Sequence, residues 1–297
     1  MKKILAIMLA VLMIVSMVAC AAKTEPQPEP EVTEEPTAEA EIEAEVGVEE
    51  EPEIEIGLEA ESDLAAIQEK GVLVVGITDF APMDYQENGE WIGFDADMAK
   101  AFAQSLGVEV EFVEIDWDNK LLELESGTID CVWNGMTLTD EVTSSMSCSN
   151  PYCNNFQVVI VPADKAADCA TVEACANLVF AVEAGSAGKA EVEKLGYQFT
   201  EVKDQASALM EVAAGTSDAA AIDSLMAGAM VGEGTSYENL AYAASLNEEE
   251  GEQYGVGFRM GSDMAQALNE FFAAAYADGS LMTCAETYGI QAAIIAQ

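Results

Sequence analysis

Residues 91–137 read WIGFDADMAKAFAQSLGVEVEFVEIDWDNKLLELESGTIDCVWNGMT. The first part predicts a helix with aspartates in its first turn, because apolar side chains recur at helical spacing and a glycine follows: Phe94, Met98, Ala101, Phe102, Leu106, then Gly107. Apolar residues alternate with glutamate over 108–112, which predicts a strand. A short helix over 121–124 and a strand over 129–133 come next. This order of elements predicts an α/β fold with a parallel sheet.

Polar and aromatic residues come directly after both of these strands. Asp116 and Trp117 follow the first strand, and Asn134, Gly135 and Thr137 follow the second. Open parallel sheets bind their ligands at the carboxyl ends of the strands. We therefore expect a ligand site at this edge of the sheet.

The composition excludes several classes of function. The chain of 297 residues has room for more than one lobe. Its formal net charge of -44 argues against nucleic acid and against an anionic membrane surface as electrostatic partners. The chain has no histidine, which removes the commonest general base and most zinc sites. We expect no metal, no cofactor and no enzymatic activity.

The first 61 residues predict a secretion signal and a spacer. Lys2 and Lys3 precede an apolar run over 4–18, which is shorter than the roughly 20 residues of a transmembrane helix and predicts a signal peptide over 1–20. Residues 21–61 are rich in glutamate and proline and predict a disordered acidic linker. A plain tether is our interpretation, with metal buffering or cell-wall binding as alternatives.

The rest of the chain repeats the strand–helix pattern. A near-continuous apolar strand over 71–77 precedes Asp79 and Phe80. A strand over 178–182 leads to Gly185 and Ser186, which open a helix whose N-terminus suits a carboxylate. A strand over 217–223 ends at Asp223, which either caps the next helix or pairs with a ligand ammonium group.

Several strings, taken in order, resemble lobe 1 of the polar amino-acid family of ABC-transporter solute-binding proteins. They are GFDADMAKAFAQSLG, Asp116-Trp117, LLELESGTIDCVWNGMTLT and SNPY, and the resemblance continues from about Leu64 to the C-terminus. In addition, Met17-Val18-Ala19-Cys20 resembles a bacterial lipobox. That implies lipidation of Cys20, with a chance cysteine in an ordinary signal peptide as the alternative.

The resemblance implies a type II periplasmic-binding-protein fold. Two lobes, each a mostly parallel sheet flanked by helices, would be joined by two hinge crossings. We expect lobe 1 over 62–158 plus 256–297 and lobe 2 over 159–255. The implied protein is a monomer anchored by lipid to the outer face of a bacterial cell membrane, and its partner is an ABC-transporter permease.

The implied substrate-binding residues come from both lobes. They are Asp79, Phe80, Trp117, Asn134, Gly135 and Thr137 from lobe 1, and Gly185, Ser186 and Asp223 from lobe 2. The family places an aromatic side chain on the ligand from the loop after the first strand, which Phe80 matches. The DAxxxD pattern of the family places Asp223 on the ligand ammonium group.

One departure from the family concerns the ligand carboxylate. Relatives usually carry an arginine just after GMT-x-T, where this chain has Val142. Arg259 is the only arginine in the sequence, and its matching position lies outside the cleft in relatives. Backbone N–H groups near Ser186, the Thr137 hydroxyl and Lys189 would have to hold a carboxylate, or the ligand is a cationic amine, an amide or a capped peptide without one.

Three functions remain to be compared. The first is a binding protein that delivers a small amine-bearing solute, most simply an amino acid, to a permease. The second is a periplasmic enzyme on the same fold, of the cyclohexadienyl dehydratase type, which the lack of histidine disfavours. The third is a sensor domain, for which the sequence up to Gln297 contains no signalling segment. We interpret the six cysteines after Cys20 as small buried residues, with a Cys169–Cys175 disulfide as the alternative.

Overall fold

The fold is described by a computed structural model that covers residues 62–297. The predicted signal peptide, Cys20 and the predicted linker up to Glu61 lie outside these residues. Within residues 62–297, none of the helices is long and apolar enough to cross a membrane.

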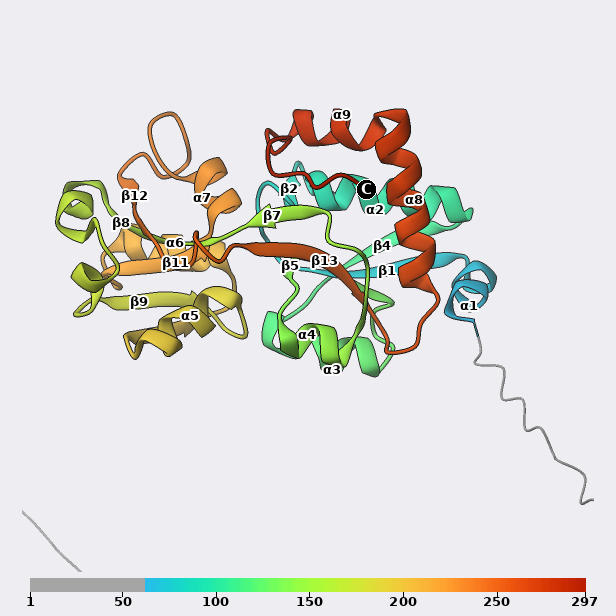
Figure 1. The fold of residues 1–297 in the computed structure, drawn as a ribbon, viewed down its shortest axis with the longest axis horizontal. Coiled ribbons are helices and arrows are strands. Elements are labelled where there is room, and N and C mark those ends of the chain that lie inside the picture. Colours follow the sequence, from blue (N-terminus) through green and yellow to red (C-terminus); the bar gives the residue numbers. More distant parts are fainter. Residues whose placement is uncertain (1–61) are drawn as a thin grey trace, which may run out of the picture. The chain divides into compact units, whose positions relative to one another are not determined.

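The first of two large sheets contains both predicted strands of residues 91–137 (Figure 1). Its order is β4-β1-β5-β13-β6, and β7 also pairs with β13. The strands are β1 (Val72–Ile77), β4 (Glu109–Glu114), β5 (Cys131–Thr137), β6 (Ser147–Cys148), β7 (Cys153–Asn155) and β13 (Glu252–Phe258). β1 is parallel to β4 and β5, whereas β13 is antiparallel to β5. The sheet is therefore mixed, and its parallel part is the one that residues 72–137 build.

The second sheet has the order β10-β9-β11-β8-β12. Its strands are β8 (Gln157–Pro162), β9 (Val179–Glu183), β10 (Gln198–Val202), β11 (Ala219–Asp223) and β12 (Leu240–Ser245). β9 is parallel to β10 and β11, and β8 is antiparallel to β11. A small hairpin of β2 (Tyr85–Glu87) and β3 (Glu90–Ile92) lies outside both sheets.

Helices flank both sheets. The first sheet carries α1 (Asp63–Lys70), α2 (Phe94–Leu106), α3 (Lys120–Glu125), α4 (Asp140–Ser145), α8 (Met264–Asp278) and α9 (Ser280–Thr287). The second carries α5 (Ala187–Leu195), α6 (Gln205–Ala214) and α7 (Ser224–Met230). Short 3₁₀ turns are η1 (Trp117–Asn119), η2 (Ala163–Cys169) and η3 (Glu173–Cys175). The architecture is the predicted α/β type II periplasmic-binding-protein fold.

The helix predicted from residues 94–106 forms as α2 and ends where a glycine permits it. Gly107 has a φ of 77°, which only glycine adopts readily, and its N–H closes the last turn on Ala103 and Gln104. Phe94 and Phe102 lie on the buried face of α2. Phe102 packs with its ring centroid 6.2 Å from that of Trp133, so the apolar stripe read from the sequence is the stripe that faces the sheet.

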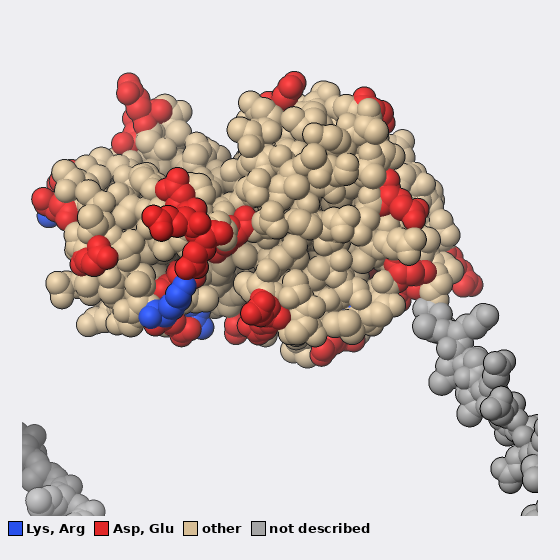
Figure 2. All heavy atoms as spheres, in the orientation of Figure 1, with Lys and Arg blue, Asp and Glu red and all other residues tan. Residues whose placement is uncertain are grey.

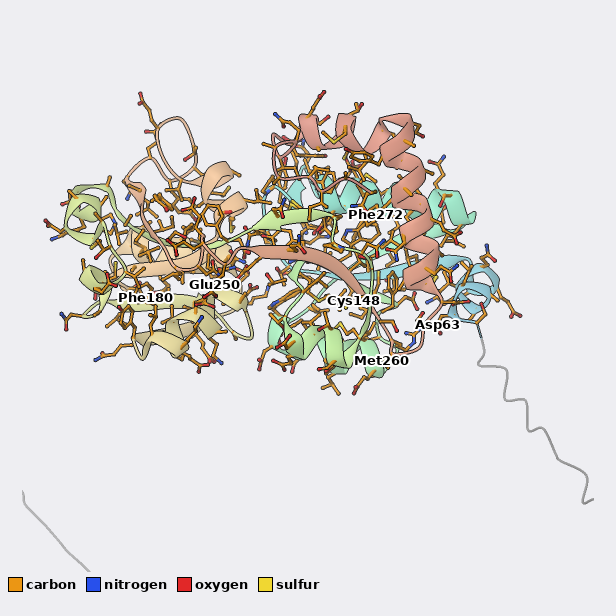
Figure 3. The ribbon with its side chains drawn as sticks, in the orientation of Figure 1. Asp63, Cys148, Phe180, Glu250, Met260 and Phe272 are labelled. Carbon is orange, nitrogen blue, oxygen red and sulfur yellow. The ribbon has the colours of Figure 1, made fainter. Side chains whose placement is uncertain are left out.

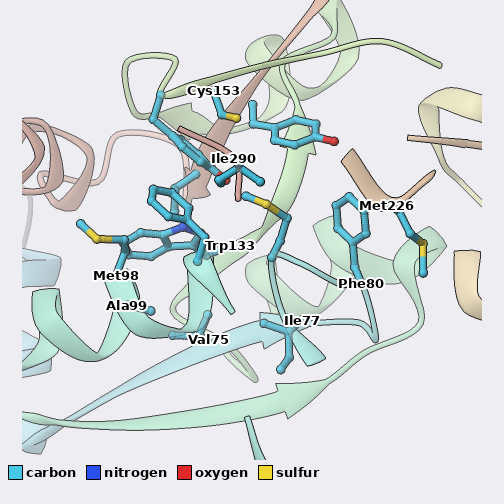
Figure 4. Packing of buried hydrophobic residues seen from close by; sticks show 14 of the residues in the cluster. Val75, Ile77, Phe80, Met98, Ala99, Trp133, Cys153, Met226 and Ile290 are labelled. Carbon is cyan, nitrogen blue, oxygen red and sulfur yellow. The ribbon is translucent and has the colours of Figure 1, made fainter. Parts of the chain in front are cut away.

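Each sheet has its own aromatic packing (Figure 3). Beside the first sheet, Phe272 of α8 meets the Trp133 ring edge-on at 5.6 Å between centroids. In the second sheet, Phe180 of β9 stacks on Tyr197 at 6.0 Å. Figure 4 shows Met98, Ala99 and Val75 gathered around Trp133. Trp133 therefore belongs to the core and leaves the end of β5 to Asn134.

The chain passes between the sheets twice. β7 pairs with β13 in the first sheet, and β8 pairs with β11 in the second from Gln157 onward, so the first crossing is at Phe156. The second lies between Ser245, the last residue of β12, and Glu252, which pairs with Asn155. From the sequence we expected the chain to pass from one lobe to the other after residue 158 and to return after residue 255. Strand pairing puts both a few residues earlier, because β8 and β13 each join their sheet from their first residue.

The six cysteines between Cys131 and Cys284 are free thiols in this structure. The pair singled out from the sequence is not joined: the Cys175 thiol donates to the carbonyl of Cys169 at 3.6 Å. Burial raises the pKa of Cys175 to about 11, which keeps it protonated near neutral pH.

Candidate ligand site

A cavity of about 440 Å³ lies at the carboxyl ends of strands from both sheets. This volume is within the range of sites that hold small molecules. Among the residues predicted from the sequence, those that line it are Trp117, Asn134, Gly135, Thr137, Gly185, Ser186 and Asp223. Asp79 and Phe80 are not among the lining residues.

Phe80 is a packed core residue. It is 2% exposed, and its ring meets that of Tyr254 edge-on with centroids 6.3 Å apart. Figure 4 shows Phe80 beside Met226 of α7. A Cβ added at Gly135 would lie 2.4 Å from the Phe80 ring, so the ring supports the cavity wall at Gly135 from behind.

Asp79 is exposed and lies in an acidic neighbourhood away from the cavity wall. Burial of part of its surface raises its pKa, and Asp204 and Glu114 raise it further. Lys203 opposes this shift and forms an ion pair with Glu114. That ion pair joins the end of β4 to the segment before α6, and thus joins the two sheets.

Trp117 supplies the aromatic wall of the cavity. It begins η1, directly after β4, and is 7% exposed. The ammonium group of Lys120 lies 4.9 Å from the centroid of the Trp117 ring, in a cation–π contact. Lys120 also donates to the carbonyl of Trp117 at 3.2 Å and to that of Gly185 at 3.0 Å. One lysine therefore links the aromatic wall to the Gly-Ser turn of the other sheet.

Asn134 and Gly135 are held in place by partners behind the cavity. The Asn134 side chain accepts from the Thr78 N–H at 2.9 Å and donates to the Thr78 hydroxyl at 2.7 Å. The Gly135 N–H donates to the Asp95 carboxylate at 2.6 Å. These bonds connect the end of β5 to β1 and α2. The oxygen and one N–H of the Asn134 amide are thus bonded to Thr78, and Asn134 lines the cavity.

Gly185 and Ser186 form the turn between β9 and α5. The Ser186 hydroxyl accepts from the Lys189 N–H at 3.1 Å as the N-cap of α5, and the Ser186 N–H donates to the Glu183 carbonyl at 3.2 Å. The backbone N–H of Ser186 is thus used by the turn itself. Ala187, the first residue of α5, lines the cavity and has an N–H without an intrahelical acceptor.

Asp223 is the buried acid of the site. Its side chain makes no cap bond to α7, although aspartate at that position could do so. It accepts instead from Gln157 at 2.9 Å, Tyr254 at 2.8 Å, and also from Asn155 and Gln205. Burial raises the pKa of Asp223 to about 7, and the Glu252 carboxylate adds to the shift.

Glu183 is the second buried acid that lines the cavity. It is 3% exposed, and its Oε1 atom has no hydrogen-bond partner. Burial raises its pKa well above the usual range, with further contributions from Asp223 and Asp204, while Lys120 and a hydrogen bond from the Gln205 side chain oppose the shift. The sequence placed this residue just before the Gly-Ser turn, but a strand glutamate gives no sign of whether it faces solvent or a cavity.

The lining contains no arginine. Val142, at the position where the family resemblance implies an arginine, lines the cavity and is 7% exposed. The basic side chains of the lining are Lys120 and Lys189. Lys189 pairs with Glu201 at 2.7 Å. Burial lowers the pKa of Lys120, although neighbouring acids, Glu183 first among them, counteract this.

The surroundings of the cavity are acidic. Six lining residues carry carboxylates: Asp118, Asp140, Glu141, Glu183, Glu193 and Asp223. Figure 2 shows that acidic side chains also far outnumber basic ones on the face that it draws. Within residues 62–297, no group of three metal-ligating side chains is close enough to hold a metal ion. The six carboxylates and two lysines of the lining therefore favour a cationic group over an anionic one.

Sequence reasoning missed two sets of residues that build the site. Gln157, Gln205 and Tyr254 hold Asp223, and Lys120 bridges the two sheets. The glutamines and the tyrosine are far from Asp223 in sequence or lie on another element, so only the folded chain brings them together. For Lys120, its place directly after the Trp117 turn was the available signal.

This architecture, with two α/β sheets joined by two crossings and a cavity at their strand ends, defines an extracellular solute-binding protein. The chain belongs to the bacterial extracellular solute-binding proteins, family 3, whose model matches residues 73–291.

Individual relatives support this assignment. The arginine-binding extracellular protein ArtP of Bacillus subtilis (strain 168) is 25% identical over 68% of this chain and 79% of its own length. An amino acid ABC transporter substrate-binding protein from Streptococcus pneumoniae Canada MDR_19A, solved bound to L-arginine, superimposes with a TM-score of 0.71 at 27% identity, over 80% of this chain and all of the other. The cyclohexadienyl dehydratase of Pseudomonas aeruginosa is 33% identical over 38% of this chain and 43% of its own length.

Proposed function

We propose that this protein captures a small amine-bearing solute, an amino acid in the simplest case, outside the cell membrane and delivers it to an ABC-transporter permease. The observation that carries the proposal is the buried Asp223 carboxylate at a cavity shared by both sheets. A carboxylate in such a place forms strong, charge-assisted hydrogen bonds to an ammonium group. The family assignment and the ligands named for relatives agree with it.

Capture depends on closure of the two sheets over the ligand. The Lys120 bond to Gly185 and the ion pair of Lys203 with Glu114 join residues on opposite sides of the cavity. These contacts would be lost if the two sheets moved apart. A ligand shifts the population toward closure only by its higher affinity for the closed state. The cross-cavity contacts lower the free energy of closure that the ligand must supply.

A ligand carboxylate has two groups of donors available in place of an arginine. The Ala187 N–H lies at the N-terminus of α5, where the helix dipole favours negative charge. The Lys120 ammonium group has three N–H donors. Two of them are donated to carbonyl oxygens, which leaves one for a ligand. A point charge and one backbone donor bind less strongly than a bidentate arginine fork. A ligand without a carboxylate is the alternative.

We also propose a monomer tethered to the outer face of the membrane through lipidated Cys20, with residues 21–61 as the spacer. The lipobox-like string supports the anchor. Replacement of Cys20 by serine is expected to release the protein from the membrane fraction. Firm retention of the Cys20→Ser variant would contradict the anchor.

The second candidate function is an enzyme, which the partial match to a dehydratase favours. We propose binding without turnover, because the chain lacks histidine, the commonest general base. Recovery of each bound solute unchanged after incubation, measured by mass spectrometry, supports binding alone. Conversion of the ligand into a product would establish the enzyme.

A thermal-shift screen tests the main proposal. The panel contains the standard amino acids, polyamines, quaternary amines and short peptides. A ligand that binds only the folded protein raises the midpoint in proportion to the logarithm of its concentration once it exceeds Kd. A shift with at least one amine-bearing solute is expected, and a panel without any shift would refute the proposal.

A further inference from the structure

The two crossings between the sheets meet at one carboxylate, that of Glu252. This residue begins β13, directly after the second crossing. Its Oε2 atom accepts from the Gln157 amide at 2.9 Å and from the Asn155 amide at 3.2 Å, on the two sides of the first crossing. Its Oε1 atom accepts from the Asn247 amide, within the second crossing, at 2.7 Å. Both oxygens of one side chain are therefore bonded to the crossings.

Two of these amides also hold Asp223. The Gln157 amide nitrogen donates to the Asp223 carboxylate at 2.9 Å, and the Asn155 amide nitrogen donates to the same oxygen. An amide –NH₂ group has two N–H donors. Each of the two amides can therefore give one hydrogen to Asp223 and one to Glu252, which uses both of its donors. Asp223 and Glu252 are thus joined through shared partners.

Glu252 also connects lining residues of both sheets. The Thr137 hydroxyl, at the end of β5, donates to the Oε2 atom of Glu252 at 3.2 Å. Thr137 and Asp223 line the cavity from the first and the second sheet, whereas Glu252 is not among the lining residues. Glu252 therefore lies behind the cavity and joins Thr137 to Asp223 through the amides of the first crossing.

The surrounding amides are not free to turn round for another side chain in place of Glu252. The Asn155 oxygen accepts from the Ser224 N–H at 3.1 Å, and the Asn247 oxygen accepts from the Gln157 N–H at 2.7 Å. Rotation of the Gln157 amide would turn its oxygen toward two carboxylates. All three –NH₂ groups are thus directed at one side chain, which must accept at both of its ends. A carboxylate does so, whereas an amide accepts at one end only.

We propose that Glu252 is a positioning residue for ligand capture: through the shared amides of Asn155 and Gln157 it fixes the Asp223 carboxylate relative to the first sheet. Without the Glu252 carboxylate, donors at both crossings lose their partner, and the position of Asp223 relative to Thr137 is no longer fixed by the crossings. This inference rests on the proposed function and adds the residue that links the ligand-binding acid to the two crossings.

Glu252 also acts on Asp223 through its charge. The two carboxylate oxygens that share the Gln157 nitrogen are each 2.9 Å from it, so they are no more than twice that distance apart. Burial is the largest cause of the raised pKa of Asp223, and the Glu252 charge adds to it. The other titratable groups that face Asp223 are the Tyr254 hydroxyl, which donates to it, and Glu183 of β9. Removal of the Glu252 charge should therefore lower the pKa of Asp223, which a purely structural role would not do.

Titration calorimetry on the purified variant Glu252→Gln tests the inference. The probes are two chemically different solutes of the thermal-shift panel that bind the wild-type protein, beginning with L-arginine and L-glutamine. At pH 8 the Kd should rise by about 10-fold, and by the same factor for both probes, because Glu252 does not line the cavity. The pH above which affinity levels off, about 7 in the wild-type protein, should fall by about half a pH unit or more.

Two further variants separate position from charge. Glu249→Gln removes one negative charge from the same crossing, but Glu249 is exposed, so the Kd and the levelling-off pH should both remain as in the wild-type protein. Asn247→Ala removes the partner of the Oε1 atom of Glu252 and leaves both carboxylates in place. Its Kd should rise by about threefold or more for both probes while the levelling-off pH remains the same.

An unchanged Kd in a folded Glu252→Gln protein would overturn the inference. A higher Kd without a shift in the levelling-off pH would overturn it too, as would the same changes in Glu249→Gln. If Glu252→Gln does not fold, Asn247→Ala decides, and an unchanged Kd in that variant contradicts the inference. These results leave the proposed function standing, which fails, together with the inference, when no amine-bearing solute of the panel binds the wild-type protein.

Discussion

Substitution of Gly185 by alanine should prevent the two sheets from closing over the cavity. Gly185 belongs to the turn before α5, and a Cβ built on it would lie 2.7 Å from the Cα of Asp118 across the cavity. Ordinary contact begins at 3.4 Å, so the two segments would have to separate by about 0.7 Å. The obstructing atom belongs to the backbone of η1, which cannot rotate away as a side chain can.

The expected effect is on binding. Overpacking of this kind costs about 1–3 kcal/mol, and here it applies only when the cavity is closed. The Kd for any ligand found in the screen should therefore rise by roughly 5-fold to 150-fold. The Gly185–Lys120 hydrogen bond across the cavity would be lengthened at the same time. Titration calorimetry gives the Kd, and small-angle scattering with saturating ligand reports whether the protein still closes.

Gly196→Ala is the matched control. Gly185 and Gly196 have φ values of 70° and 72°, so alanine experiences the same backbone strain at both positions, about 1–2 kcal/mol. A Cβ at Gly196 meets no atom within 4 Å. Both variants should therefore lose similar thermal stability, and only Gly185→Ala should lose affinity. Equal Kd values for the two variants would refute the reasoning that this contact limits closure.

Three further predictions concern the lining. Replacement of Trp117 by alanine removes the aromatic wall and the cation–π contact to Lys120, so ligand affinity should fall by about 10-fold; an unchanged Kd in calorimetry would mean that the ring does not contact the ligand. Val142→Arg should tighten binding of an amino acid by supplying a carboxylate fork, and loss of binding in the same assay would favour a ligand without a carboxylate. Asp223 has a folded-state pKa of about 7, so its carboxyl is protonated below that pH, and affinity for an ammonium group should rise by up to about tenfold per pH unit until about pH 7 and then level off. In the protein without ligand the sign is opposite: a pKa raised from 3.8 means that this group favours folding most at low pH and loses that contribution as the pH rises toward 7. A pH-independent Kd between pH 5.5 and 8 would show that Asp223 does not pair with the ligand.

The positions of the site residues show how much of a binding site local sequence patterns can predict. Trp117 follows β4, while Asn134, which the sequence placed just after a strand, lies within β5; both line the cavity, because the ends of parallel strands meet at one edge of a sheet. Phe80 also follows a strand, yet its ring packs against Tyr254. Pattern and spacing give the position of a residue along an element, whereas the direction of a loop side chain depends on which distant residues surround it.

Asp223 shows that local sequence patterns also do not decide the role of a residue. From the sequence, a helix cap and a ligand contact were both open. In the structure the carboxylate turns away from α7 and accepts from Gln157, Gln205 and Tyr254. These three partners come from β8, α6 and β13, and no local pattern could have shown that they converge on one carboxylate.

The residues by themselves determined most of the elements, the α/β class and the expectation of a site at the carboxyl ends of the strands, because helical and alternating periodicity, glycine stops and polar strand ends are local properties. The two-lobe fold came from the resemblance to a family. The tertiary structure alone decided the electrostatics of the cavity: that Lys120 bridges the two sheets and that the Oε1 atom of Glu183 is buried without a hydrogen-bond partner. The cost of a buried charge depends on every group within a few ångströms, and those groups come together only when both sheets are folded.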